Sequence, residues 1–277
     1  MLILSGRVRS TTIQRDVVLE QKNEIVDSIT YAQKIQAAML PPETYFSELI
    51  NENFILYRPR DIVSGDFYWI KQVNQSIILA AADCTGHGVP GALMSMLGMS
   101  FLDEIVQRRE ITQANQVLNE LRSQIKHSLR QHGYEDESRD GIDIALLVLD
   151  VKTKMIQYAG ARNPLYLVRD VQGLPELEVI KADPMPLGYY PAKDKSFTNH
   201  DIQLESEDTI YLFSDGYVDQ KGGKDNKKFL SKNFKKLLVD INEQAMHIQK
   251  EILDKTLTDW MGDNSQMDDV LVIGVRV

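Results

Sequence analysis

Aspartates stand at four places where a short apolar stretch of the chain begins or ends. They are Asp66, Asp83, Asp215 and the pair Asp268-Asp269. One aspartate in such a place is ordinary turn chemistry, because Asp is common where a strand enters a hairpin. Four such places predict carboxylates that converge at one edge of a sheet.

Converging carboxylates repel one another, so at least one of their pKa values rises unless a cation neutralises them. The candidate ligands are oxygen atoms, which favour Mg²⁺ or Mn²⁺. Zinc is disfavoured because the chain has one cysteine and no pair of histidines. Several aspartates can hold two such ions with a water between them. That water becomes acidic enough to attack a phosphoryl group, whose charge the same ions neutralise.

The loop Gly86-His87-Gly88 follows one of these aspartates and precedes a predicted helix at 90–108. Its glycines allow the backbone to approach an ion or a phosphate closely, and a helix N-terminus favours an anion. His87 is a candidate general acid that protonates the leaving oxygen. The alternative is a hydrogen bond from His87 that stabilises the loop.

Apolar runs and turn residues predict the elements that position these side chains. The predicted strands are residues 54–57, 67–70, 76–82, 144–151, 155–159, 165–169, 177–180, 209–214 and 270–277. Helices are predicted at 90–108, 112–132, 230–240 and 243–260, and the polar segment 220–228 resembles a flexible loop. Adjacent strands with paired helices indicate an α+β fold of two stacked antiparallel sheets, rather than a doubly wound parallel sheet.

A helical pattern over residues 14–40 precedes these elements and ends at Pro41-Pro42. Apolar residues recur in it every seven positions: Val18, Ile25, Ala32 and Met39. This spacing is typical of a two-helix coiled coil and predicts a homodimer. The alternative is an amphipathic helix that packs on its own domain.

Composition narrows the classes of function. The chain has 277 residues, is 43% hydrophobic and carries a net charge of −9. This acidity argues against binding nucleic acid or anionic lipid, so we expect neither a nucleic-acid partner nor direct membrane contact. Cys84, the single cysteine, excludes an internal disulfide and suits a reducing cytoplasm. We find no continuous apolar stretch of the length that spans a bilayer.

Six motifs together resemble the SpoIIE-type branch of the metal-dependent (type 2C, PPM) serine/threonine phosphatases. They are Gly65-Asp66-Phe67-Tyr68, the block 82–92, Tyr158-Ala159-Gly160-Ala161, Pro186-Leu187-Gly188, Phe213-Ser214-Asp215-Gly216 and Asp268-Asp269. Their order and spacing match over residues 54–277. The resemblance implies an αββα sandwich with a centre of two Mn²⁺ or Mg²⁺ ions.

Carried over position by position, the resemblance implies a ligand set. Asp66 and Asp83 would be shared ligands, together with the backbone carbonyl of Cys84. Asp215 and one of Asp268 and Asp269 would complete the set, and Asp268 is preferred as the first acid of the pair. Together with His87, the candidate general acid, Asp66 and Asp83 are the expected catalytic residues.

The sequence also departs from the family pattern. Leu271 stands where the family often has threonine, and Ala161-Arg162-Asn163 where it often has histidine. We interpret Arg162 as a surface residue, with contact to a substrate phosphate as the alternative. Asp140 and Asp143 are candidates to support the metal ligands from outside or to bind a third ion.

The resemblance implies a substrate class and a division of the chain. Family members dephosphorylate phosphoserine or phosphothreonine on small regulatory proteins, commonly anti-sigma-factor antagonists of the STAS type. Residues 1–42 would form a linker and dimerisation helix whose orientation controls activity, and 43–277 the phosphatase domain.

Two other functions remain as alternatives. Ser64-Gly65-Asp66-Phe67 resembles the hairpin signature of diguanylate cyclases, but it lacks the paired glycines and the second acid, and it leaves the later aspartates without a role. The other alternative is an inactive phosphatase fold that serves as a binding or dimerisation module. The presence of every expected carboxylate argues against it.

Overall fold

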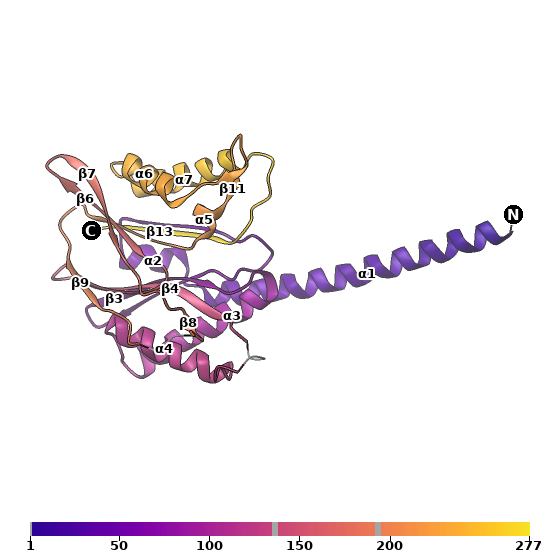
Figure 1. The fold of residues 1–277 in the computed structure, drawn as a ribbon, viewed down its shortest axis with the longest axis horizontal. Coiled ribbons are helices and arrows are strands. Elements are labelled where there is room, and N and C mark those ends of the chain that lie inside the picture. Colours follow the sequence, from indigo (N-terminus) through magenta and orange to yellow (C-terminus); the bar gives the residue numbers. More distant parts are fainter. Residues whose placement is uncertain (1, 135–137, 192–194) are drawn as a thin grey trace.

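Two antiparallel sheets lie face to face, with helices on the outer face of each (Figure 1). The computed structural model describes residues 2–134, 138–191 and 195–277. The architecture confirms the α+β sandwich expected from the sequence.

Strands distant in the sequence are neighbours in each sheet, and all the named pairings are antiparallel. One sheet has, in spatial order, β1 (Asn53–Arg58), β13 (Val270–Arg276), β10 (Thr209–Phe213), β6 (Leu165–Val171) and β7 (Leu174–Ile180). The other has β2 (Phe67–Val73), β3 (Ser76–Cys84), β4 (Gly141–Asp150), β5 (Met155–Ala161) and β9 (His200–Gln203), with β8 (Leu187–Gly188) paired to β4.

Helix pairs cover the two outer faces. The sheet that contains β3 is covered by α3 (Gly88–Leu102), its π-helical continuation Asp103–Arg108, and α4 (Ala114–Ser128). The sheet that contains β13 is covered by α6 (Ser231–Ile241) and α7 (Met246–Met261). Two short helices, α2 (Glu43–Leu49) and α5 (Gly216–Asp219), complete the domain.

Alternation along β3 explains why its sequence is a continuous apolar run. Ile77, Leu79 and Ala81 belong to the core between the two sheets. The alternate residues Ile78 and Ala80 belong to the core beneath α3 and α4. Because successive side chains of a strand point to opposite faces, both faces of this strand must be apolar.

Among the described residues, Gly88–Arg108 is long and apolar enough to cross a membrane, which the sequence expectation did not foresee. Half of that window is buried inside the domain. Met99, Leu102 and Ile105 pack into the core beneath it, so in this structure the segment is a core helix.

The first helix, α1 (Leu2–Met39), projects away from the sandwich (Figure 1). It begins earlier than the predicted residue 14. Val18 and Ile25, two members of the seven-residue repeat, are 61% and 60% exposed. The domain therefore leaves this part of the stripe uncovered, and among the described side chains of α1 it is Gln36, near the end of the helix, that is buried against the domain.

Gln36 anchors that end of α1. Its side chain is buried, and its Nε2 donates to the carbonyl of Ser64 at 2.6 Å and to Oγ of Ser95 at 2.8 Å. The backbone N–H of Ser64 donates back to Oε1 at 3.1 Å. One side chain thus joins α1 to the loop that precedes Asp66 and to α3.

The segment predicted as a flexible loop is instead a small hairpin of β11 (Lys221–Gly222) and β12 (Lys227–Lys228). The N–H of Gly223 donates to the carbonyl of Trp260, and the indole of Trp260 donates to the carbonyl of Gln220. These contacts with α7 order the segment. They are tertiary contacts, so the local sequence did not predict them.

We expect Gln36→Ala to lower the free energy of unfolding by about 1–3 kcal/mol, because the buried backbone groups of Ser64 lose their partners. Urea unfolding of the full chain measures this. The matched control is Gln33→Ala, at an exposed position of the same helix. Equal stabilities of the two variants would contradict the anchoring role.

Candidate metal centre

The strand register brings the aspartates of one sheet together. Asp83 on β3 lies directly opposite Asp143 on β4. Phe67 pairs with Ala82, so Asp66, one residue earlier, lies beside Asp83 on the other side. Like charges on adjacent strands are destabilising unless something compensates them.

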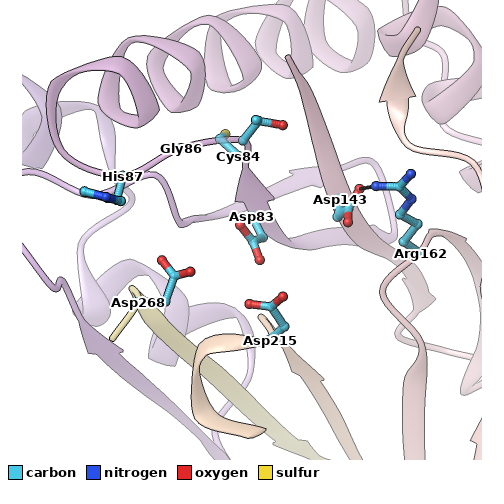
Figure 2. Close-up of a pocket in the computed structure, with 9 residues that line it drawn as sticks. Asp83, Cys84, Gly86, His87, Asp143, Arg162, Asp215 and Asp268 are labelled. Atoms are coloured by element: carbon cyan, nitrogen blue, oxygen red, sulfur yellow. Dashed lines mark ion pairs between the residues drawn. The ribbon is translucent and has the colours of Figure 1, made fainter. Parts of the chain in front are cut away.

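The second sheet contributes from across the sandwich. Asp215 follows β10 and Asp268 precedes β13, and these two strands are paired. Side chains from both sheets line one pocket of about 180 Å³. Its lining residues are Asp83, Cys84, Thr85, Gly86, His87, Asp143, Arg162, Asp215 and Asp268. Figure 2 shows the carboxylates of Asp83, Asp215 and Asp268 turned toward a common space.

The carboxylates in this pocket are electrostatically strained. Burial, then the charges of Asp215 and Asp268, raise the pKa of Asp83 to about 8. Burial and the neighbouring charges of Asp219 and Asp268 also raise the pKa of Asp215. The strain arises because acidic groups crowd one small pocket whose lining contains a single arginine.

Asp66 lies behind the pocket rather than on its surface. It is 2% exposed, and its Oδ2 accepts a hydrogen bond from Oγ of Ser214 at 2.5 Å. Burial and the charge of Asp83 raise its pKa well above the usual value. The sequence did not single out Ser214 as a residue that holds Asp66, although Ser214 is part of the motif around Asp215.

The pair Asp268-Asp269 divides between two roles. Asp268 lines the pocket. Asp269 is buried, and its two oxygens accept the backbone N–H groups of Arg60 and Gly65, each at 2.7 Å. Asp269 therefore secures the loop before Asp66, and the geometry favours Asp268 as the residue that faces a ligand.

Cys84 presents its backbone to the pocket, because its side chain is buried in the core beneath α3 and α4. The neighbouring loops approach it closely. A Cβ atom on Gly65 would lie 2.7 Å from the carbonyl oxygen of Gly86 and 3.3 Å from that of Cys84. Glycine is required at position 65 for the loops to pack around the pocket.

His87 lies on the pocket wall at the start of α3. Its Nδ1 is 2.8 Å from Oδ2 of Asp61, and both side chains are partly exposed. A carboxylate at Nδ1 fixes the orientation of an imidazole and directs Nε2 elsewhere. The sequence analysis missed Asp61, whose only signal was its place in the loop before Ser64-Gly65.

Asp143 and Arg162 lie together at the right of Figure 2, across the pocket from His87, with 3.6 Å between Arg162 Nη1 and Asp143 Oδ1. Burial, opposed by Arg162, raises the pKa of Asp143 to about 6. Asp140 does not line the pocket, and its carboxylate accepts a hydrogen bond from Ser138. The structure thus separates Asp140 from the group that contains Asp143.

The donor chemistry fits a hard divalent cation. The ligand atoms on offer are carboxylate and carbonyl oxygens, which Mg²⁺ and Mn²⁺ prefer. Within the described ranges, no three His, Cys, Asp or Glu side chains converge tightly enough to hold one ion by themselves. Mg²⁺ is commonly bound through one or two carboxylates while it keeps several waters, so this spacing is compatible with it.

The profile of the family described as Stage II sporulation protein E (SpoIIE) matches residues 74–277, most of the chain. The chain belongs to the SpoIIE family. Solved structures agree with this assignment. The SiaA-PP2C domain of Pseudomonas aeruginosa is 31% identical, with a TM-score of 0.81, and the match covers 92% of this chain and 98% of that one.

More distant structures share the fold. The PP2C phosphatase domain of SpoIIE from Bacillus subtilis, with a fragment of its regulatory domain, is 15% identical, with a TM-score of 0.65 over 82% of this chain and 63% of that one. The RsbU and RsbW domains of a Mycobacterium tuberculosis protein are 20% identical, with a TM-score of 0.59 over 81% and 59%. No curated protein sequence matches significantly. This SpoIIE-family chain therefore has a PP2C-type phosphatase fold.

We expect this SpoIIE-family domain to lose stability from pH 6 to pH 8 in a chelating buffer. The folded pKa of Asp83, about 8, exceeds its unfolded value of about 3.9, so the folded state binds more protons. That contribution is present at low pH and is lost as the pH rises through 8. The loss between pH 6 and pH 8 is about 2 kcal/mol.

Thermal unfolding at several pH values measures this, with Asp83→Asn expected to show a shallower decline. The control is Asp225→Asn, an exposed aspartate in the β11–β12 hairpin. Parallel pH profiles for wild type and Asp83→Asn would contradict the crowding of carboxylates around Asp83.

Proposed function

We propose that this chain is a metal-dependent protein serine/threonine phosphatase that acts on a small phosphorylated regulatory protein. The observation that carries the proposal is the pocket where Asp83, Asp215 and Asp268 converge from two sheets. Crowded acids that repel one another only cost a binding module stability, whereas a centre for divalent cations uses them as ligands.

We assign the ligand roles from this placement. Asp83, Asp215, Asp268 and the backbone carbonyl of Cys84 would hold two Mg²⁺ or Mn²⁺ ions. Asp66 would be a further ligand, next to Asp83. Its Oδ2 accepts the hydrogen bond from Ser214, whereas its Oδ1 has no hydrogen bond to the described residues and is left for an ion. When bound, the ions neutralise phosphoryl charge and lower the pKa of a bound water. A fold-related structure, that of RsbX, is described in complex with magnesium.

His87 would protonate the leaving serine oxygen. The contact between its Nδ1 and Asp61 supports this role, because it orients the ring and leaves Nε2 for the substrate. The same contact also holds the loop, so the two roles considered from the sequence are compatible.

The substrate and the setting follow from the resemblance. We propose a phosphorylated STAS-type anti-sigma-factor antagonist as substrate, and a cytoplasmic protein without nucleic-acid or direct membrane contact. Structures with a similar fold include the RsbU and RsbW domains of one protein, and one described under the heading of the bacterial stressosome. Residues 1–42 would serve as the linker and dimerisation helix, and 43–277 as the phosphatase domain.

We expect Mn²⁺- or Mg²⁺-dependent release of phosphate from a phosphoserine peptide. Asp83→Asn and Asp215→Asn should lower kcat/KM by at least about a hundredfold, because each loses an anionic ligand. Asp225→Asn serves as the exposed control. A folded wild type that is inert with both metals would instead support the inactive binding module.

The choice of substrate separates the role of His87 from that of the metal ligands. His87→Gln should lower kcat for phosphoserine by about a hundredfold. It should barely affect para-nitrophenyl phosphate, whose leaving group does not need a proton. An equal loss on both substrates would show that His87 acts only through the loop.

We expect the chain to be a homodimer through α1, because the seven-residue stripe is exposed. Sedimentation of the full chain measures this. Val18→Glu combined with Ile25→Glu should yield monomers, whereas Asn23→Glu, which lies outside the stripe, should not. A wild type that sediments as a monomer at all concentrations would contradict the coiled coil.

A further inference from the structure

Arg162 contributes the one arginine or lysine side chain among the described residues that line the carboxylate pocket. A phosphoserine substrate brings nearly two negative charges into this space. The aspartates repel it, and bound metal ions would offset that repulsion. A guanidinium on the wall would add directed hydrogen bonds to the phosphate, because its fork of donors matches phosphate oxygens.

The backbone at Arg162 is held in a conformation that is unusual for its side chain. Its φ is +59°, in the left-handed region that favours glycine. Strained backbone of this kind persists where the surrounding structure enforces it, and it is concentrated at functional sites.

Hydrogen bonds on both sides enforce this turn. The N–H of Arg162 donates to the carbonyl of Asp183 at 2.8 Å, and the N–H of Asp183 donates to the carbonyl of Gly160 at 2.9 Å. The hydroxyl of buried Tyr158 donates to the carbonyl of Asn163 at 2.6 Å. Position 160 admits only glycine, because a Cβ there would lie 2.0 Å from the Tyr158 hydroxyl.

The register then places the side chain. Ala161 pairs with Ile144, so Arg162 follows β5 beside Asp143, which itself lies opposite Asp83. Arg162 Nε donates to the carbonyl of Pro184 at 3.3 Å, and Nη1 contacts Asp143 at 3.6 Å. These contacts fix one edge of the guanidinium and leave the other donors for a ligand. The side chain is 49% exposed, so an incoming substrate can reach it.

We propose that Arg162 anchors the phosphate of the substrate at the wall of the pocket opposite His87. This inference rests on the proposed phosphatase function and deepens it. The sequence favoured a surface arginine, whereas the structure places Arg162 on the pocket wall, in a turn fixed by hydrogen bonds.

Binding of inorganic phosphate in the presence of Mg²⁺, measured by calorimetry, tests the proposal without requiring turnover. Arg162→Ala should weaken phosphate binding about tenfold and raise KM for a phosphoserine peptide by a similar factor. Arg162→Lys should recover only part of the loss, because an ammonium lacks the planar fork. The control is Arg109→Ala, which removes only surface ion pairs with Glu104 and Glu120.

A double variant distinguishes two roles of Arg162: binding the phosphate, or neutralising the charge of Asp143. If Arg162 only neutralised Asp143, then Arg162→Ala with Asp143→Asn would restore wild-type phosphate binding. If Arg162 anchors phosphate, binding stays weak in the double variant. The concentration of Mg²⁺ at half-saturation should not rise in Arg162→Ala, because the removed group is a cation.

Wild-type phosphate binding in Arg162→Ala, or its restoration in the double variant, overturns the proposal while the phosphatase function survives. A wild type that binds no phosphate overturns it as well. A wild type that binds phosphate through Arg162 but releases none from any phosphopeptide defeats the phosphatase function instead.

Discussion

Repulsion among carboxylates crowded around one pocket is the constraint on which this structure depends. The two sheets bring Asp83, Asp215 and Asp268, which are far apart in the sequence, around one small pocket. The pKa of Asp83 rises to about 8 because its own carboxylate is partly buried and because the charges of Asp215 and Asp268 lie close to it. The three apolar layers of the sandwich must supply the stability that holds the acids together.

The surroundings of the pocket are arranged to keep this geometry. Asp269 ties down the loop before Asp66, and Ser214 holds Asp66 itself. Gln36 of α1 is hydrogen-bonded to Ser64 in the same loop, so the projecting helix is connected directly to the loop beside the pocket. A change in the position of α1 would therefore act first on the backbone beside the carboxylates.

Much of this was predictable from the sequence, and the exceptions have physical causes. Apolar runs predicted the long strands, because both faces of strands such as β3 are buried. Carboxylates at strand ends predicted a common site. The roles of Asp268 and Asp269 could not be separated with certainty, because they depend on contacts with a loop about 200 residues away. The contact of His87 with Asp61 and the turn at Arg162 depend likewise on tertiary packing.

The central claim is that these acids exist to hold metal ions. Anomalous diffraction from crystals of the full chain grown with Mn²⁺ tests it most directly. We predict two manganese peaks within the pocket, in contact with Asp83, Asp215 and Asp268. Manganese bound only elsewhere on the chain, or no peak in the pocket at saturating Mn²⁺, would contradict the account.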